Sequence, residues 1–243
     1  MKESNRWDGF YQQSTIPLSE GFRYETLSDY TAKTFLWMFF GLLTTFGVAV
    51  AAYATNLGAV LFQVPGMFWI LGLAEILLVV FLSARVEKMS VASARVLFFV
   101  YALVNGLVFS SYLWLFELGD VLMAFGAAAL YFGAMAAYGY MTKRDLTTWK
   151  PMLTFGLIAM LVAGVLSALF LGGTSVVYSM LGVVLFACYT AYDTQKIKAI
   201  YFAYAGDETM SKKMSILAAL QLYLDFINLF LYLLRIFARS DND

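Results

Sequence analysis

Histidine is absent from this chain of 243 residues, and cysteine occurs once, as Cys188. Without histidine, any sensing of pH near neutrality falls to carboxylates in an unusual environment. A single cysteine excludes an internal disulfide framework, and on an apolar segment Cys188 is expected to be a small packing residue. Metal-binding motifs, P-loops and nucleophile triads are also lacking. We therefore expect neither an enzyme nor a bound cofactor.

Charge is scarce as well. Charged residues make up 13% of the chain and apolar residues 62%, whereas a soluble domain has roughly 25% charged residues. This composition predicts a polytopic membrane protein in contact with lipid. The basic and acidic residues balance, and no basic tract indicates a nucleic-acid partner. The polar N-terminal segment lacks the apolar core of a signal peptide, so no cleaved leader is expected.

Seven apolar runs, each near the roughly 20 residues that a bilayer core requires, predict an all-α membrane domain over residues 34–238. A polar tail (1–33) precedes it and a short tail (239–243) follows it. Tight turns are expected at residues 117–120 and 171–174. The predicted spans are 34–55, 67–84, 96–116, 121–140, 152–171, 175–193 and 214–238.

Lysine and arginine are distributed unevenly along this map. Fourteen of the 16 basic residues lie in the N-terminal tail and in the loops after the second, fourth and sixth spans. The positive-inside rule therefore predicts a cytoplasmic N-terminus, and seven crossings place the C-terminus outside. Arg235 and Arg239 are the exceptions, and a re-entrant last span would return them to the inside.

Small residues recur at helical spacing in three of the spans. Such residues let transmembrane helices approach closely, so each set predicts a packing face. The sets are Gly41, Thr45 and Ala49; Gly106 and Ser110; and Ala129, Gly133 and Ala137.

The last apolar run carries a polar stripe. At about 100° per residue, five side chains fall within an arc of about 80° on a helix, namely Gln221, Asp225, Asn228, Tyr232 and Arg235. Every other position from 221 to 235 is Leu, Ile, Phe or Tyr. A charge that faces lipid costs several kcal/mol, so the stripe is expected to face protein or water, on a central helix.

Ionisable residues of other spans are candidate partners for the stripe. Glu75 and Arg235 fall at similar depths in the outer half, either as a structural ion pair or as an outer gate. Asp193 and Asp225 would share a proton if they converged, because two carboxylates in low dielectric cannot both ionise cheaply. However, the predicted spans place Asp193 roughly 12–14 Å deeper toward the cytoplasm. Convergence needs a tilted, broken or offset helix; otherwise Asp193 ends its span and pairs with Lys196.

Two segments carry a family signature. Residues 191–198 read Ala-Tyr-Asp-Thr-Gln-Lys-Ile-Lys, and residues 222–230 read Leu-Tyr-Leu-Asp-Phe-Ile-Asn-Leu-Phe, followed by Leu-Leu-Arg at 233–235. Together they resemble the Bax inhibitor-1 (transmembrane Bax inhibitor motif) family. Residues 138–146 resemble the loop after the fourth span in its bacterial YccA- and YbhL-like members. The resemblance extends over about residues 30–238.

The resemblance implies seven transmembrane helices, the seventh enclosed by the other six, in a bacterial inner membrane. Family members are described as pH-sensitive calcium leak channels whose sensor, a hydrogen-bonded aspartate pair, corresponds to Asp193 and Asp225. It also implies a contact of Glu75 with Arg235, and pairing of an arginine at or near Arg85 with the first aspartate. Ca²⁺, which takes oxygen ligands, would be the permeant ion, with transient contacts at the aspartates.

Four functions compete at this point. In a pH-gated cation leak, protonated aspartates close the cytoplasmic end, and ionised ones repel and loosen the seventh helix. An intramembrane aspartyl protease also uses two aspartates, but Leu-Tyr-Leu precedes Asp225 in place of Gly-x-Gly, and the chain has no Pro-Ala-Leu motif. A non-conducting stress regulator would bind other membrane proteins, such as a membrane protease. A small-anion transporter is the fourth alternative.

Overall fold

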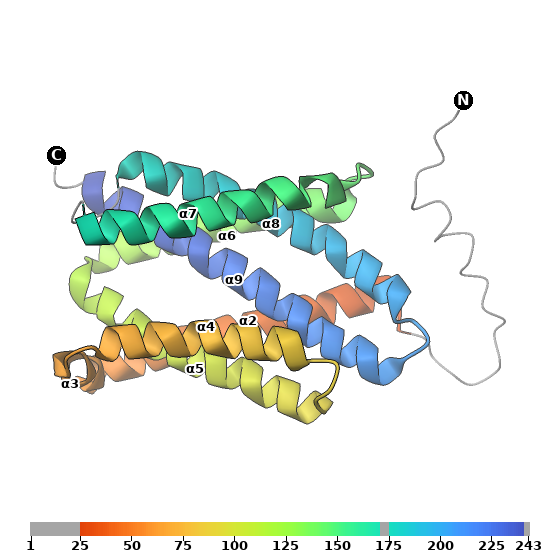
Figure 1. The fold of residues 1–243 in the computed structure, drawn as a ribbon, viewed down its shortest axis with the longest axis horizontal. Coiled ribbons are helices and arrows are strands. Elements are labelled where there is room, and N and C mark those ends of the chain that lie inside the picture. Colours follow the sequence, from red (N-terminus) through yellow and green to blue (C-terminus); the bar gives the residue numbers. More distant parts are fainter. Residues whose placement is uncertain (1–24, 171–174, 241–243) are drawn as a thin grey trace.

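Long helices make up nearly all of the protein. The computed structural model describes residues 25–170 and 175–240, and within those ranges it contains no strand. The all-α prediction is confirmed, and each expected span falls on one long helix; the turn expected at residues 171–174 lies outside the described residues. In chain order the elements (Figure 1) are α2 (Leu27–Ala54), α3 (Leu57–Gln63), α4 (Met67–Arg85), α5 (Val91–Leu115), α6 (Leu118–Met141), the 3-10 helix η1 (Leu146–Trp149), α7 (Lys150–Phe170), α8 (Val176–Ala203) and α9 (Glu208–Ser240).

Several of these helices can cross a membrane. Six segments of the described chain are long and apolar enough, namely α2, α5, α6, α8, Leu146–Ser167 with α7, and Glu208–Ala238 of α9. The remaining long helix, α4, has 19 residues, of which only Glu75 and Arg85 are charged. Many outward side chains are large and apolar, such as Leu130 and Phe155, as expected for surfaces that face lipid. The protein is therefore a multi-pass membrane protein, and the count of seven crossings stays a prediction.

The first helix begins earlier than predicted. α2 starts at Leu27 and not at residue 34, because Thr26 and Asp29 form a capping box. The Thr26 hydroxyl accepts a hydrogen bond from the Asp29 amide at 3.1 Å, and the Thr26 amide donates to the Asp29 carboxylate at 3.4 Å. These bonds satisfy amides that a helix start leaves unpaired. Lys33 therefore lies on α2, whereas residues 1–24 of the predicted tail lie outside the described residues.

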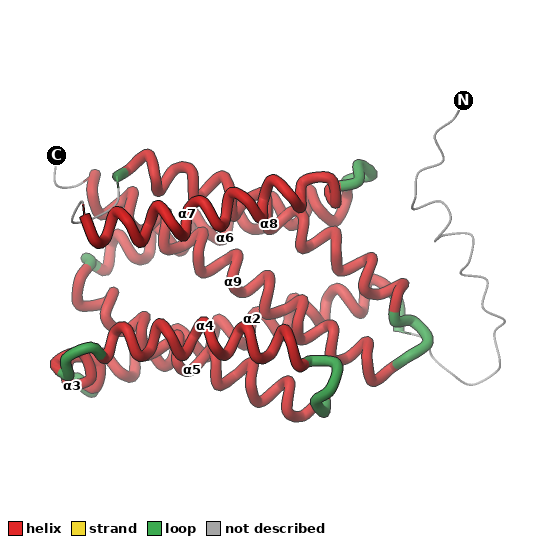
Figure 2. The backbone as a smooth tube through the Cα atoms, viewed as in Figure 1, coloured by secondary structure: helices red, strands yellow, loops and turns green. Residues whose placement is uncertain are grey.

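The helices form two groups with α9 between them. α2 and α4 pack on α5, while α6 and α7 pack on α8, and α9 runs obliquely from one group to the other (Figures 1 and 2). α9 contacts α2, α5, α6 and α8. In its most apolar 18-residue window 67% of the residues are buried, against 44% or less in the other candidate spans. The helix with the polar stripe is thus the most buried span, while its enclosure by all six others stays a prediction.

Basic residues gather at one end of the bundle, at the right in Figure 1. The α4–α5, α6–α7 and α8–α9 loops meet there with the start of α2. We call this the basic end. Its loops and the adjoining helix ends carry Lys33, Arg85, Lys88, Arg95, Lys143, Arg144, Lys150, Lys198, Lys212 and Lys213.

Two of the three predicted packing faces are confirmed. The small residues of α2 and α5 are buried, and a Cβ added at Gly106 would lie 2.7 Å from the Thr45 carbonyl oxygen. The face predicted on α6 is wrong, because Ala129, Gly133 and Ala137 are exposed. Small residues occur all around α6, so their spacing did not identify the face that packs. The buried positions are Asp120, Ala124, Ala128, Phe132, Ala136 and Gly139.

Candidate functional site

A cavity of about 310 Å³ lies between α7, α8 and α9. Four of the five residues of the polar stripe line it, which are Gln221, Asp225, Asn228 and Tyr232, and Asp193 of α8 joins them. The wall is completed by apolar and aromatic residues of three helices, namely Leu157, Met160 and Leu161 of α7, Phe186 and Tyr189 of α8, and Leu224 of α9. Four residues of the stripe thus border a partly open pocket between helices, whereas the fifth, Arg235, is exposed; that the whole stripe faces away from lipid stays a prediction.

The structure brings Asp193 and Asp225 together at this cavity. They are 8% and 4% exposed, and their carboxyl groups interact electrostatically. The predicted depth difference fails for two reasons. α8 continues to Ala203, so Asp193 lies inside the helix, roughly 15 Å before its end at 1.5 Å per residue. α9 is oblique, so its length overstates the depth of Asp225.

The immediate surroundings of the two carboxyl groups are sparse in hydrogen bonds. Among the described residues no hydrogen bond joins Asp193 to Asp225, and Asp225 Oδ2 has no partner. Lys196 interacts electrostatically with both aspartates, but its Nζ donates to Gln221 Oε1 at 3.1 Å. The ion pairs of the described residues do not include Lys196 with Asp193, so the alternative in which these two side chains form a direct ion pair is not realised. Two buried carboxyl groups thus lie at this cavity, and Lys196 is the cation that interacts with them within the described ranges.

Gln195 fixes the part of α8 that carries Asp193. Its Oε1 accepts a hydrogen bond from the Leu146 amide at 2.8 Å, and its Nε2 donates to the Arg144 carbonyl at 2.7 Å. The side chain thus ties α8 to the α6–α7 loop, next to η1. Residues 191–195 are all buried, so the family signature coincides with a packed junction of three elements.

Gln195→Leu is expected to destabilise the protein by about 2–6 kcal/mol, because the buried Leu146 amide and the partly buried Arg144 carbonyl lose their hydrogen-bond partner at about 1–3 kcal/mol each. The adjacent Thr194 is the matched control. Its hydroxyl is buried with no partner, so Thr194→Val removes a polar group that makes no bond. Thermal unfolding midpoints in detergent should fall for Gln195→Leu and stay near the wild-type value for Thr194→Val. Equal midpoints for both variants would contradict the assigned role of Gln195.

The expected contact between Glu75 and Arg235 is absent. The ion pairs within the described residues are Lys33–Glu25 and Lys212–Glu208. Arg235 is exposed, with its guanidinium 5.7 Å from the centre of the Tyr232 ring. Both charged groups interact electrostatically with Tyr112 of α5. They therefore lie in one region, with Tyr112 as their common neighbour in place of a direct bond.

Glu75 belongs to a second polar group that the sequence reasoning missed. It interacts with Asn105 of α5, whose Nδ2 donates to the Tyr101 hydroxyl at 3.3 Å. The hydroxyls of Tyr223 and Thr45 are 2.6 Å apart on the same side of α9. Asn105 is the one amide side chain in the apolar run of α5, and this was the signal that could have identified it.

Arg85 does not reach the aspartates. Its side chain is exposed, and it forms no ion pair with Asp193 in the described chain. The reason is the helix arrangement: α4 packs on α3 and α5, across α9 from the α7–α8 wall of the cavity (Figure 1).

Known proteins match this chain over the whole predicted membrane domain. The family model described as "Inhibitor of apoptosis-promoting Bax1" matches residues 27–242. Inner membrane protein YbhL of Escherichia coli (strain K12) is 40% identical over 217 residues, 87% of this chain and 92% of that protein. An uncharacterized protein of Deinococcus radiodurans is 39% identical over 214 residues, 87% and 91% of the two chains. One of Borreliella burgdorferi is 36% identical over 221 residues, 89% and 94%.

Proposed function

This chain belongs to the Bax inhibitor-1 family, and we propose that it is a pH-sensitive cation leak channel gated by Asp193 and Asp225. The observation that carries the proposal is the pair of buried, electrostatically interacting carboxyl groups at one cavity beside the most buried helix. By analogy with the inner membrane relative, the channel would reside in a bacterial inner membrane. The basic end would face the cytoplasm, and the N-terminus with it.

Gating follows from the two protonation states of the pair. With a proton bound, one carboxyl group can donate a hydrogen bond to the other, which supplies a partner for the unpaired Asp225 Oδ2 and holds α9 against α8. With both groups ionised, like charges repel in a poorly hydrated space. This repulsion would separate α9 from α8 and widen the cavity toward the basic end.

Ca²⁺ is the proposed permeant ion. Carboxylate oxygens suit this hard cation, which takes six to eight oxygen ligands when it is held as a resident ion. No cluster of three or more candidate ligand side chains occurs within the described ranges. Two carboxylates and the nearby amide oxygens would therefore contact a passing Ca²⁺ ion briefly and would not bind it tightly.

Reconstitution of the full chain into liposomes tests the proposal. Ca²⁺ release from loaded proteoliposomes should rise as the pH is raised through about 5 to 8, because burial and mutual repulsion move the ionisation of a carboxylate pair toward neutral pH, and it should exceed release from protein-free liposomes. Release that is equal at every pH would overturn pH gating. Release no greater than that from empty liposomes would favour the alternative, a non-conducting stress regulator, which would then be sought by co-purification of a defined membrane partner.

A further inference from the structure

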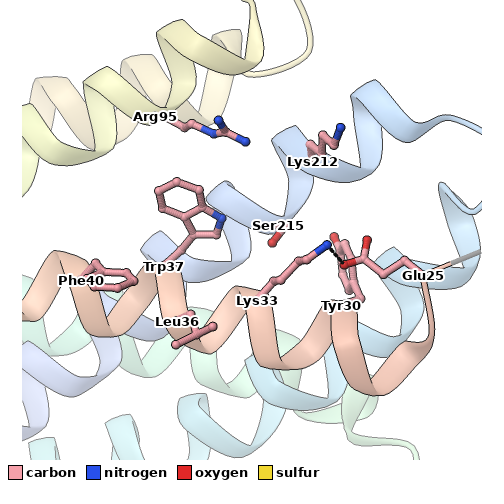
Figure 3. Close-up of a pocket in the computed structure, with 9 residues that line it drawn as sticks. All are labelled: Glu25, Tyr30, Lys33, Leu36, Trp37, Phe40, Arg95, Lys212 and Ser215. Carbon is pink, nitrogen blue, oxygen red and sulfur yellow. Dashed lines mark ion pairs between the residues drawn. The ribbon is translucent and has the colours of Figure 1, made fainter.

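A second pocket, of about 300 Å³, lies at the basic end, remote from the aspartates. Helices α2, α5 and α9 each contribute one cationic side chain to it, namely Lys33, Arg95 and Lys212 (Figure 3). Leu36, Trp37 and Phe40 of α2 form its apolar side. The pocket is thus cationic at one edge and apolar at the other, and the signature motifs account for none of it.

The three cations differ in their availability. Lys33 pairs with Glu25 at 2.7 Å and Lys212 with Glu208 at 2.5 Å. Arg95 pairs with no carboxylate in the described part of the chain, and its guanidinium lies 5.0 Å from the centre of the Trp37 ring (Figure 3). An arginine held over an aromatic ring keeps its planar set of N–H donors for an external anion, with geometry suited to a phosphate.

The apolar side of the pocket continues onto the lipid-facing surface. Leu36 and Phe40 are 52% and 48% exposed, and Phe39 and Leu43 extend the same surface along α2. α2 has 28 residues, or about 42 Å at 1.5 Å per residue, so its ends project about 6 Å beyond a hydrocarbon core of about 30 Å. Lys33 then lies near the headgroup boundary, and Phe40 lies below it among the acyl chains.

We propose that this pocket binds the headgroup of an anionic phospholipid, with its phosphate on Arg95 and Lys212 and an acyl chain along Leu36 and Phe40. Charge complementarity favours this occupant, since Glu25 and Glu208 offset only Lys33 and Lys212 and leave the charge of Arg95 without a paired carboxylate in the described chain. Basic pockets between transmembrane helices at a cytoplasmic surface bind such headgroups. The proposal does not depend on channel activity. A lipid at this place would link α2, α5 and the first turns of α9.

Native mass spectrometry of the full chain tests the proposal. The protein would be equilibrated with equal amounts of phosphatidylglycerol and phosphatidylcholine of matched chain length, and the retained lipids would be counted. We expect preferential retention of phosphatidylglycerol, lowered at least about threefold by Arg95→Gln. Arg144→Gln is the control, because it makes the same change at another exposed position of the basic end.

Further variants separate binding from folding and lipid from free anion. Lys212→Gln alters an exposed side chain and should also lower retention, whereas Arg95→Lys keeps the charge and should lower it less than Arg95→Gln. Equal retention of the two lipids, or equal losses in Arg95→Gln and Arg144→Gln, would overturn the proposal and leave the pocket to residues 1–24 or a second copy of the chain. Displacement of the lipid by an equal concentration of soluble glycerol phosphate would overturn the role of the acyl chain.

Discussion

Asp225→Asn is expected to make Ca²⁺ flux through the reconstituted protein insensitive to pH between about 5 and 8, the range to which burial and coupling move a carboxylate pair. Asp225 is 4% exposed and interacts with Asp193 across the cavity. Two ionised carboxylates in such a poorly hydrated place repel each other. Asparagine has nearly the same shape but cannot ionise, so this repulsion never develops. Asp193→Asn should have the same effect, because the pair acts as a unit.

Glu75→Gln is the matched control for these two variants. It also neutralises a carboxylate inside the bundle, but Glu75 lies on α4 beside Asn105 and does not line the cavity. Its pH profile should therefore keep the wild-type midpoint. The measurement is the rate of Ca²⁺ release from proteoliposomes at matched protein density. If both aspartate variants keep the wild-type pH profile of Ca²⁺ release, or if Glu75→Gln loses its pH dependence, the aspartate pair is not the sensor.

The polar stripe was predictable because it depends on a local period and a large energy. Residues of one helix keep their angular relation in any fold, and a charge in hydrocarbon costs several kcal/mol. The sequence therefore predicted that Asp225 and its neighbours share one face, and four of the five stripe residues line one pocket. The sequence did not show the depth of Asp193 in the membrane relative to Asp225. The predicted sixth span ends at its first charged residue, Asp193, whereas α8 stays helical through Lys196 and Lys198. The long side chains of these two lysines can extend their charged ends into the membrane surface.

Contacts between helices were harder to predict than faces of one helix. Similar depth suggested that Glu75 and Arg235 would pair, and the family resemblance implied that an arginine at or near Arg85 would pair with Asp193. Depth says nothing of the rotation of each helix or of the group to which it belongs. α4 packs on α5 and the cavity is walled by α7 and α8, so Arg85 is remote from the aspartates. Glu75 is near Asn105, a neighbour from α5 that depth alone does not select.

Alanine at Gly139 is expected to lower the thermal unfolding midpoint sharply, whereas alanine at Gly133 on the same helix is expected to maintain or raise it. Alanine is favoured over glycine in a helix interior by about 1 kcal/mol, so the intrinsic effect is stabilising at both positions. Gly133 is exposed, and a Cβ there meets nothing within 4 Å. At Gly139 the added Cβ would overlap the backbone carbonyl of Ala191.

The overlap at Gly139 cannot be relieved by a side-chain rotation, because the atoms that it meets belong to the backbone of α8. The two helices must separate, and overpacking of this kind costs about 1–3 kcal/mol or more. Ala191 lies two positions before Asp193, so the separation should also alter the pH profile of Ca²⁺ release. Thermal midpoints in detergent and release assays on both variants provide the measurement. Equal midpoints would mean that α6 and α8 do not approach as closely at Gly139 as the structure shows.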